Sequence, residues 1–324
     1  MYAMTEPSPE FSFVGPGDVD EIVTLFERSF ARTMTGDYYG WQFLESAAGG
    51  ARSVVARVGG RIVSHAGYSA RACRLAGDEG LLFAKHTSMT DPDWRGRGIY
   101  SRLLTWAHER LAETGAGLVL SWPNPMNHCI QIARDDYHDI RQITVLRRDP
   151  SSVLSPKDPP FPSTPERFGG GYDGLGRATP GSASFTYLRS AGYLSWRYSD
   201  RPDVDYFLVE ERESGELRSA VVCKLYPAKE PMRIMVVEWL SRPGQPEADR
   251  PFRRLEEFSE EAGLPILLWQ NVHDRTRHRL LEKRGYVPAE PVTYFGAFPI
   301  GGECPEGFSD FANWYVSMGD VDVF

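Results

Sequence analysis

Hydrophobic residues recur along this chain at two spacings, one typical of helices and one typical of β-strands. Between Asp18 and Ala31 the apolar side chains follow a helical period, and Gly17-Asp18 suits the start of a helix. After this helix the apolar residues form short runs separated by turns such as Gly59-Gly60. These runs predict a meander of antiparallel strands at residues 53–57, 61–69, 71–75 and 81–89.

The meander leads into a strand, a glycine-rich turn and a helix in immediate succession. The fourth strand is closed by the turn residues Thr90-Asp91-Pro92-Asp93, and the sequence Arg-Gly-Arg-Gly follows at 95–98. Helical spacing begins at Ile99. Another strand is predicted at 117–122, because the next residue is a proline and cannot continue a central strand.

Residues 149–180 contain so many prolines, glycines and serines that they are typical of a linker. Beyond them the hydrophobic pattern predicts a second set of elements. Helices are expected at residues 190–198, 251–262 and 274–284. Strands are expected at residues 205–211, 218–226, 234–240 and 265–269 and after Tyr286. The chain is therefore expected to form two domains.

The 324 residues are 41% hydrophobic and 25% charged, which fits an ordered globular protein with apolar surface enough for two cores. A net charge of −8 disfavours nucleic acid as a partner, because phosphate binding favours a basic surface. Four cysteines without a C-x-x-C pair, and an N-terminus without signal-peptide character, favour a reduced, cytoplasmic protein. No apolar run approaches the ~20 residues needed to cross a bilayer, so we expect no membrane insertion.

The turn at 95–98 has the chemistry of a phosphate-binding loop. Gly96 and Gly98 allow the backbone to approach a ligand closely, and Arg95 and Arg97 add positive charge. The amides that open the following helix attract anions, so a pyrophosphate group would suit this turn. Two other phosphate loops are excluded, because the segment matches neither G-x-x-x-x-G-K-[ST] nor G-x-G-x-x-G.

The same segment resembles the coenzyme A loop of the GNAT superfamily of N-acetyltransferases. The family pattern is Gln or Arg, two residues, Gly, one residue, and then Gly or Ala. Arg95, Gly98 and Tyr100 stand at these places, and Tyr100 departs from the pattern because it is bulky. Pro123 to His128 resembles the P-N-x-x-[SN] segment of acyltransferases of sugar and antibiotic biosynthesis. Leu281 to Tyr286 resembles the helix end that precedes the last strand of such domains.

The resemblance implies an α/β (α+β) fold with two tandem acetyltransferase-like domains, each a mixed, mostly antiparallel sheet flanked by helices. Residues 10–150 would be the acyl-CoA-binding domain and residues 151–182 a Pro/Gly-rich linker. Residues 183–324 would be a degenerate copy, because the sequence Ser-Arg-Pro-Gly-Gln-Pro at 241–246 stands where the first domain has its glycine turn.

The resemblance also implies acetyl-CoA or another acyl-CoA as co-substrate, without a metal. The donor thioester would lie near the end of the strand, at Ser88, Met89 and Thr90. The pyrophosphate would lie at the turn and the helix start, formed by Arg95, Gly96, Arg97, Gly98, Ile99, Tyr100 and Ser101. Asn124 and Asn127 are candidates for hydrogen bonds to the pantetheine amides, because asparagine offers both a donor and an acceptor.

Candidate acid and base residues are histidines. Strand alternation would place one set of side chains on a single face: Leu82, Ala84, His86, Ser88 and Thr90. No Asp or Glu stands on this strand after Leu81, so His86 is the first candidate to accept the proton of the amine, and His65 is the second. His128 is a candidate donor to the leaving thiolate, whereas Tyr137 fits the core better.

The expected reaction is direct attack of an amine on the thioester in a ternary complex, which needs proximity rather than a covalent intermediate. The resemblance suggests a small-molecule acceptor such as an amino sugar or another secondary metabolite. Transfer to a protein or peptide amine or to a hydroxyl group remains an alternative. A non-catalytic sensor or scaffold that binds acyl-CoA is an alternative of another class. The sequence is compatible with a monomer or a homodimer.

Overall fold

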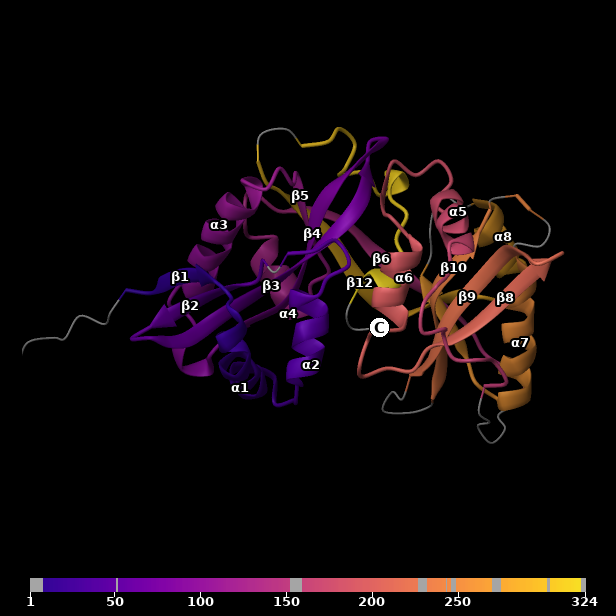
Figure 1. Ribbon diagram of the computed structural model, residues 1–324, viewed down its shortest axis with the longest axis horizontal. Coiled ribbons are helices and arrows are strands. Elements are labelled where there is room, and N and C mark those ends of the chain that lie inside the picture. Colours follow the sequence, from indigo (N-terminus) through magenta and orange to yellow (C-terminus); the bar gives the residue numbers. More distant parts are fainter. Residues whose placement is uncertain are drawn as a thin grey trace, which may run out of the picture. The chain divides into compact units, whose positions relative to one another are not determined.

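The computed structural model describes residues 8–50, 52–151, 159–226, 232–242, 244–245, 249–269, 275–301 and 304–321. The chain forms two compact units (Figure 1). The first unit comprises Met1–Ala72, Gly80–Ser121 and Ala297–Cys304, and the second comprises Cys73–Glu79, Trp122–Gly296 and Pro305–Phe324. Each unit combines helices with a mixed, mostly antiparallel arrangement of strands, which confirms the predicted fold class.

The first unit contains most of the predicted meander. Its strands are β1 (Glu10–Phe13), β2 (Val54–Val58), most of β3 (Arg61–Leu75), most of β4 (Asp78–Thr90) and β5 (Leu118–Ser121). Its helices are η1 (Pro16–Asp18), α1 (Val19–Phe30), α2 (Gly36–Tyr39), η2 (Gly40–Leu44), η3 (Pro92–Trp94) and α3 (Ile99–Ala112). The strand order is β1-β2-β3-β4-β5, in which β4 and β5 are parallel because α3 connects them.

Helices cover both faces of the sheet in the first unit (Figure 1). On one face, the aromatic side chains of α2 and η2 share a core with α1 and with Met89 of β4. On the other face lies α3, whose His108 ring is 6.1 Å from the ring of Tyr68 on β3 and 4.8 Å from that of Phe298. The amphipathic pattern of α1 and α3 thus buries an apolar stripe against the sheet, as the sequence predicts.

The second unit contains the remaining elements. Its helices are α4 (Pro125–Gln131), α5 (Gly171–Ala178), α6 (Ala191–Tyr198), α7 (Arg250–Ala262), α8 (Arg275–Lys283), η5 (Phe311–Asn313) and η6 (Met318–Asp320). Its strands are β6 (His138–Arg148), β7 (Phe185–Tyr187), β8 (Phe207–Glu213), β9 (Glu216–Tyr226), β10 (Arg233–Ser241), β11 (Ile266–Trp269) and most of β12 (Val287–Pro299). The order of the main strands is β6-β11-β10-β9-β8, and α7 packs its apolar side chains on this sheet.

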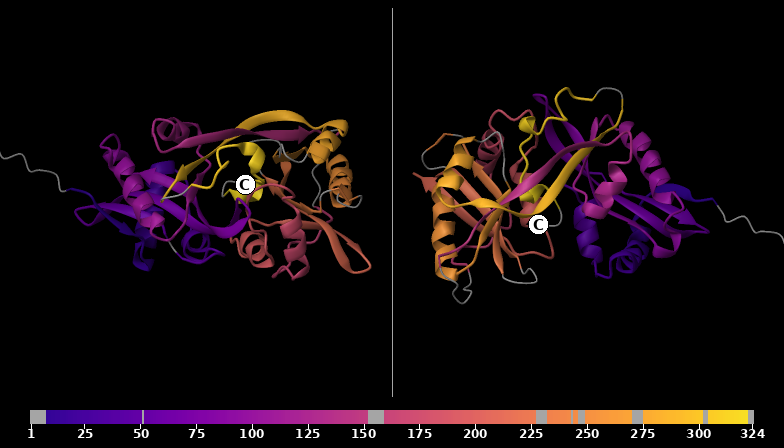
Figure 2. Two further views of the ribbon diagram at one scale, coloured as in Figure 1. Left: turned by 90° about the horizontal axis from the view of Figure 1, so that it is seen from above. Right: turned by 180° about the vertical axis from the view of Figure 1, so that it is seen from behind.

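Each unit includes a strand or strand end from the opposite part of the sequence: β6 belongs to the second unit, and the end of β12 belongs to the first. β6 follows β5 in the chain but pairs with β11, with Arg148 opposite Ile266. The final residues of β12, Ala297–Pro299, belong to the first unit, where the Ile300 amide donates to the Gly117 carbonyl at 2.9 Å. Figure 2 shows β6 in magenta beside β12 in yellow-orange, its neighbour in the strand order.

The compact units therefore do not divide where the sequence places the boundary. The predicted domain 10–150 includes β6, which belongs to the second unit, and the predicted domain 183–324 includes the end of β12, which belongs to the first. The predicted linker at 151–182 lies within the second unit, and its described part contains α5. Phe168, Tyr172 and Leu175 of this segment are buried, so it contributes to a core despite its composition.

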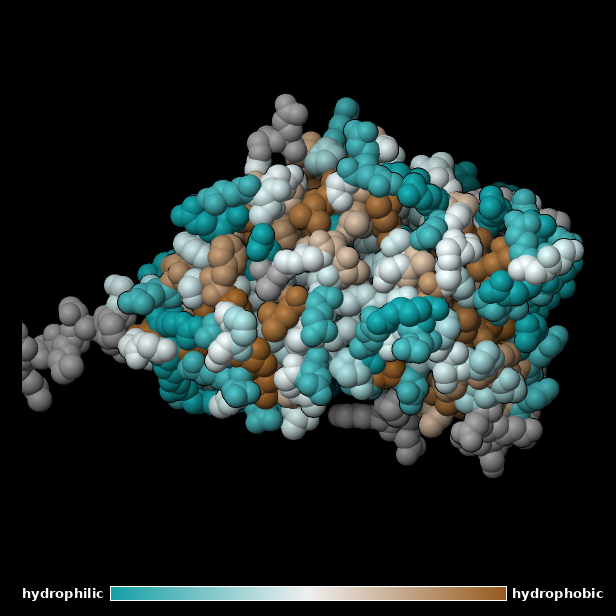
Figure 3. Space-filling view, in the orientation of Figure 1, coloured by the Kyte–Doolittle hydropathy of each residue, from teal (hydrophilic) through white to brown (hydrophobic). Residues whose placement is uncertain are grey.

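Apolar side chains gather inside the units, and the face seen in Figure 3 mixes hydrophilic residues with small hydrophobic groups. Within the described part of the chain, no helix combines the length and the apolar character that a bilayer crossing requires.

Candidate functional site

The glycine turn between β4 and α3 has the backbone that a phosphate loop requires. Gly96 and Gly98 adopt left-handed conformations, with φ of +76° and +68°, and Gly98 is the N-cap of α3. Among the described residues, nothing lies within 4 Å of a Cβ built at either position, so the backbone angle rather than space calls for glycine. The turn is exposed, and the amides of the first turn of α3 lie beyond the helical ladder.

Both arginines of the turn bind backbone carbonyls close to it. The Arg95 Nε donates to the Thr90 carbonyl at 3.1 Å and its Nη2 to that of Ser29 at 3.3 Å. Arg97 lies over the ring of Trp94 at 4.6 Å and donates to the Asp93 carbonyl at 3.2 Å. These bonds leave the guanidinium charges at the exposed turn, which therefore combines exposed glycine backbone with positive charge.

The start of the turn is anchored by a buried carboxylate. Asp91 is completely buried, and its two oxygens contact Arg28 at 3.1 Å and Arg61 at 2.5 Å. The same side chain accepts a hydrogen bond from the Asp93 amide at 3.0 Å, which caps η3. Asp91 thus ties the loop to α1 and β3 through charge-assisted bonds, which are the stronger kind of hydrogen bond.

The strand before the turn is interrupted by one residue. Thr87 has φ of +46°, a left-handed conformation that β-branched residues rarely adopt. Lys85 lies 4.8 Å from the centroid of the Phe298 ring on the α3 face, whereas Met89 belongs to the core cluster on the α1 and α2 face. The extra residue reverses the alternation, as a β-bulge does.

The predicted arrangement of side chains on this strand is therefore wrong beyond residue 86. His86 lies on the α2 face, with its ring 6.5 Å from that of Phe43, and Met89 rather than Ser88 and Thr90 shares that face. Regular alternation assumed an unbroken strand.

The two parallel strands separate before the turn. β4 pairs with β5 from Phe83 opposite Val119 to Lys85 opposite Ser121, and β5 ends there. β4 continues to Thr90. The backbone of Ser88, Met89 and Thr90 therefore runs past the end of β5 and up to the glycine turn, which places the predicted thioester residues and the predicted pyrophosphate residues in one continuous segment.

Two of the predicted histidines lie on β3 and β4 of the first unit. His65 is completely buried, and burial lowers its pKa to about 4 although a hydrogen bond with the Thr87 carbonyl opposes this. Its Nε2 is 3.0 Å from the hydroxyl of Tyr39. His86 is also buried, on the same face of the sheet as Phe43.

The remaining predicted residues belong to the second unit. Asn124 is the N-cap of α4 and accepts a hydrogen bond from the Asn127 amide at 2.9 Å. The His128 ring stacks on Tyr294 with centroids 3.9 Å apart, and its Nε2 is 3.1 Å from a carboxylate oxygen of Asp139. Tyr137 is buried, and burial together with Asp139 raises the pKa of its hydroxyl.

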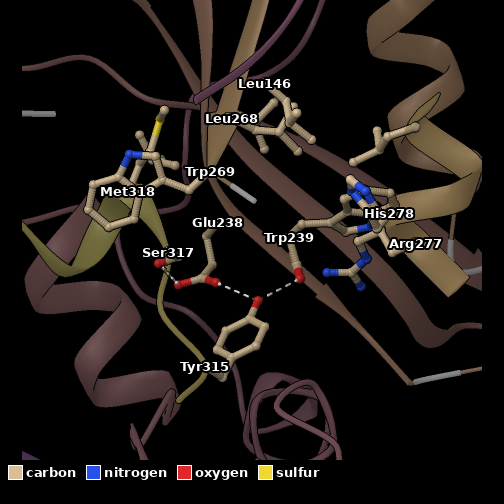
Figure 4. A pocket seen from close by; sticks show the side chains of 13 residues that line it. Leu146, Glu238, Trp239, Leu268, Trp269, Arg277, His278, Tyr315, Ser317 and Met318 are labelled. Carbon is tan, nitrogen blue, oxygen red and sulfur yellow. Dashed lines mark hydrogen bonds between the residues drawn. The ribbon is translucent and has the colours of Figure 1, made fainter. Parts of the chain in front are cut away.

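The second unit repeats the order of strand, helix and parallel strand in β10, α7 and β11. Among the described residues, β10 pairs with β11 at two positions, Ile234 opposite Ile266 and Met235 opposite Leu267. Its register with β9 shifts after Val236, so β10 is also bulged. A cavity of about 40 Å³ lies where the two strands separate, and the lining includes two tryptophan rings, shown in Figure 4.

The buried carboxylate beside this cavity, that of Glu238, is already hydrogen-bonded to other side chains of the protein. The buried carboxylate of Glu238 accepts hydrogen bonds from Arg189 at 2.9 Å, from Ser317 at 3.0 Å and from Tyr315 at 3.4 Å. Figure 4 shows Tyr315 and Ser317 turned toward it. Arg277 lies over the ring of Trp239 at 3.9 Å. The separated strands of the second unit therefore enclose a small space beside an internal ion pair.

Several residues of the first unit were not predicted as part of a site, namely Arg28, Tyr39, Arg61, Thr87 and Asp91. An aspartate before a proline at a strand end is a recognisable cap, so Asp91 carried a signal. The others act through partners far away in the sequence, which no local pattern indicates. In the described part of the chain, no group of three or more His, Cys, Asp or Glu side chains could hold a metal ion.

An exposed glycine turn that opens a helix thus stands next to two parallel strands, of which β4 runs past the end of β5. Residues 10–129 match the family model of the GNAT acetyltransferase domain. The chain thus carries a domain of the GNAT superfamily and is an acyltransferase, which supports acyl-CoA as a co-substrate. No curated protein matches the sequence.

Solved structures share the fold over most of the chain. A GCN5-related N-acetyltransferase from Anabaena variabilis is 10% identical, covering 90% of this chain and 72% of its own, with a TM-score of 0.68. A probable N-acyltransferase from Enterococcus faecalis is 13% identical, covering 90% and 73%, with a TM-score of 0.66. An N-myristoyltransferase from Saccharomyces cerevisiae with bound myristoyl-CoA and inhibitors is 10% identical, covering 91% and 82%, with a TM-score of 0.59. At these identities the likeness establishes the fold alone.

Proposed function

We propose that this protein transfers an acyl group from acyl-CoA to an amine of a small molecule, such as an amino sugar or another secondary metabolite. The observation that carries the proposal is the exposed turn at Gly96 and Gly98, which opens α3 directly after the part of β4 that runs past the end of β5. Helix N-termini with glycine turns bind phosphate groups, and the separated strands leave backbone groups for the arm that carries the thioester.

In this proposal the pyrophosphate binds the amides from Gly96 to Ser101, and Arg95 and Arg97 supply the positive charge. The thioester lies along Ser88, Met89 and Thr90. Backbone amides there would stabilise the oxyanion that forms when the amine attacks, and such preorganised donors are usually the largest contribution to acyl transfer.

Proton transfer is assigned to histidines. His86 stands just before the bulge of β4 and is the proposed acceptor of the amine proton. His128 is the proposed donor to the leaving thiolate, because the adjacent Asp139 carboxylate, at 3.1 Å, would orient its ring. Asn124 and Asn127 are proposed to bind the pantetheine amides. Residues 183–324 are proposed to be a degenerate acetyltransferase-like domain.

A second candidate is transfer of a longer acyl chain to a peptide amine. The likeness to a yeast N-myristoyltransferase holding myristoyl-CoA favours this candidate. Transfer to a hydroxyl group, or binding of acyl-CoA without turnover, would use the same donor site with a different acceptor or none.

The test is release of free CoA from acetyl-, octanoyl- and myristoyl-CoA in the presence of amino sugars, an amino alcohol and a peptide with a free N-terminus, with mass spectrometry of each product. The proposal expects an N-acylated amino compound. Acylation of the peptide alone would favour the second candidate, and an ester product would favour O-acyl transfer. A thermal shift with acyl-CoA but no product from any acceptor would favour a sensor.

Two matched variants test the donor site. Gly98→Ala and Gly115→Ala both place a side chain at a left-handed position, with φ of +68° and +83°, at opposite ends of α3. Each should lose about 1 kcal/mol of stability from the backbone strain. Only Gly98→Ala should weaken binding of CoA in a calorimetric titration. Equal affinities in the two variants would contradict the assignment of the turn.

A further inference from the structure

The bulge of β4 is strained and needs support from its surroundings. Thr87 holds φ of +46° within a strand, although its two Cβ substituents disfavour this region. A non-glycine residue in the left-handed region persists only where neighbouring contacts impose it, and such residues concentrate at functional sites. The structure must therefore contain groups that hold this residue in place.

The carbonyl group of Thr87 is held by a histidine of the neighbouring strand. His65 Nδ1 lies 2.9 Å from the Thr87 oxygen, and its Nε2 lies 3.0 Å from the Tyr39 hydroxyl. A carbonyl oxygen only accepts hydrogen bonds, so Nδ1 must carry the proton. In the neutral ring Nε2 is then the acceptor, and the Tyr39 hydroxyl donates to it.

The side chains of His65 and Tyr39 are both buried. His65 and Tyr39 have no exposed surface, and Tyr39 is packed against Phe43 with ring centroids 4.8 Å apart. Burial lowers the pKa of His65 to about 4, which keeps the ring neutral near pH 7. Since its one lone-pair nitrogen already accepts from Tyr39, His65 has no ring nitrogen left to take a proton from a substrate.

A second side chain of β3 holds the strand two residues further on. The Ser64 hydroxyl donates to the Met89 carbonyl at 2.9 Å and lies 3.0 Å from the Thr90 hydroxyl. Ser64 and His65 thus bind the backbone oxygens of residues 89 and 87 from adjacent positions. The segment between these oxygens is the one that follows the bulge and leads to the glycine turn.

We propose that His65 is a positioning residue: through the hydrogen bond from its Nδ1 to the Thr87 carbonyl it fixes the bulge and so sets the backbone of Ser88, Met89 and Thr90 for the donor thioester. This inference rests on the proposed function, since it assigns these three residues to the donor. It replaces the expectation that His65 accepts the proton of the amine, and it leaves His86 in that role.

Two substitutions that introduce amide side chains, His65→Asn and His65→Gln, test the two ring nitrogens of His65 separately. Asn places its amide nitrogen near the position of Nδ1, so His65→Asn can still donate to the Thr87 carbonyl. Gln places its amide group near Nε2, where the amide oxygen can accept from the Tyr39 hydroxyl, so His65→Gln can reach Tyr39 but not Thr87. A positioning role predicts that His65→Asn keeps kcat/KM for acyl-CoA within about threefold, whereas His65→Gln loses at least tenfold, because small displacements of reacting groups have large effects.

A proton-accepting role predicts a different pattern. Both variants would then lose kcat equally, and both would lose the acidic limb of the pH–rate profile that belongs to the missing base. Equal loss in the two variants would overturn the proposal. Tyr39→Phe serves as a further variant: it removes the donor to Nε2 but leaves the bond to Thr87, so it should behave like His65→Asn.

Hydrogen exchange in a peptide covering residues 82–94 tests the proposal without turnover. His65→Gln should speed exchange at Ser88 and Met89 relative to His65→Asn, at matched global stability. Unchanged exchange in His65→Gln would overturn the positioning role. If the wild type neither binds nor consumes acyl-CoA while this difference in exchange is present, the proposed function fails and the support of the bulge by His65 stands.

Discussion

Each unit places a helix after a bulged strand, but the described residues at the starts of the two helices differ. In the first unit, α3 opens on Gly98 and its first turn reads Ile-Tyr-Ser-Arg. In the second unit, α7 opens on Asp249, and Pro251 in its first turn has no amide hydrogen to offer. An arrangement of strand, helix and parallel strand is therefore not sufficient to bind a ligand. The residues at the start of the helix determine whether its amides can bind an anion.

The two units also stabilise their bulged strands by different means. Neutral hydrogen bonds from His65 hold β4, whereas β10 carries Glu238 in a buried ion pair with Arg189. Arg189 also contacts Asp320, with both groups buried. The first arrangement leaves an exposed loop free for a ligand. The second ties the strand to the segment at 317–320 and encloses the space beside it.

The largest effect should come from the buried charges of the second unit. Arg189→Met leaves the carboxylates of Glu238 and Asp320 without their cation, which should cost about 3–5 kcal/mol of unfolding free energy. Urea denaturation measures this loss. Arg177→Ala, which breaks an exposed pair with Glu79, should change stability by less than about 0.5 kcal/mol. A small effect of Arg189→Met would show that the two units are not held differently.

The first unit should instead be sensitive to acid through His65. Its pKa is about 4 when folded and 6.5 when unfolded, so between these values the unfolded chain takes up a proton that the folded chain does not. The stability contribution is full above pH 6.5 and is lost as the pH falls toward 4, by about 3 kcal/mol in total. Unfolding measured at pH 4 to 7 should show this loss in the wild type and not in His65→Asn. Parallel curves for the two proteins would contradict it.

The anchor of the glycine turn should have a smaller effect on stability and a specific effect on the ligand. Asp91→Asn removes the charge that faces Arg28 and Arg61 and should cost about 1.5–3 kcal/mol, the range for hydrogen bonds to charged groups. Calorimetry should also show weaker binding of CoA. Asp93→Asn is the control, because Asp93 is largely exposed and contacts only Arg28 among these two arginines. Equal affinities for CoA in the two variants would show that the Asp91 anchor does not contribute to CoA binding.

The smallest effect concerns the strained residue itself. Thr87→Gly relieves the left-handed strain but adds freedom to the unfolded chain, so the two contributions should cancel to within about 0.5 kcal/mol. Ser88→Gly, at the next position and without a positive φ, should cost about 0.5–1 kcal/mol. Thermal unfolding of the two variants compares them directly. A larger loss for Thr87→Gly than for Ser88→Gly would mean that the threonine side chain, not the backbone, supports the bulge.

Local patterns predicted most elements of both units. Helices α1, α6, α7 and α8 lie within a residue or two of the predicted ranges, because their apolar periodicity reports the face that each buries. Helix α5 was missed, since proline and glycine around it suggested a linker, although Tyr172 and Leu175 bury its apolar side. Composition reports the tendency of a segment to be flexible and not whether a core lies beside it.

The chemistry of the glycine turn follows from the amino-acid sequence alone, because its causes are local. Gly96 and Gly98 permit the left-handed backbone, and the following residues form a helix whose first amides have no partner within it. Three features depend on the tertiary structure instead: the bulge at Thr87, the bonds of Asp91 to Arg28 and Arg61, and the placement of β6 in the second unit and the end of β12 in the first. Each of these depends on groups many residues apart in the chain, and only folding brings such groups together.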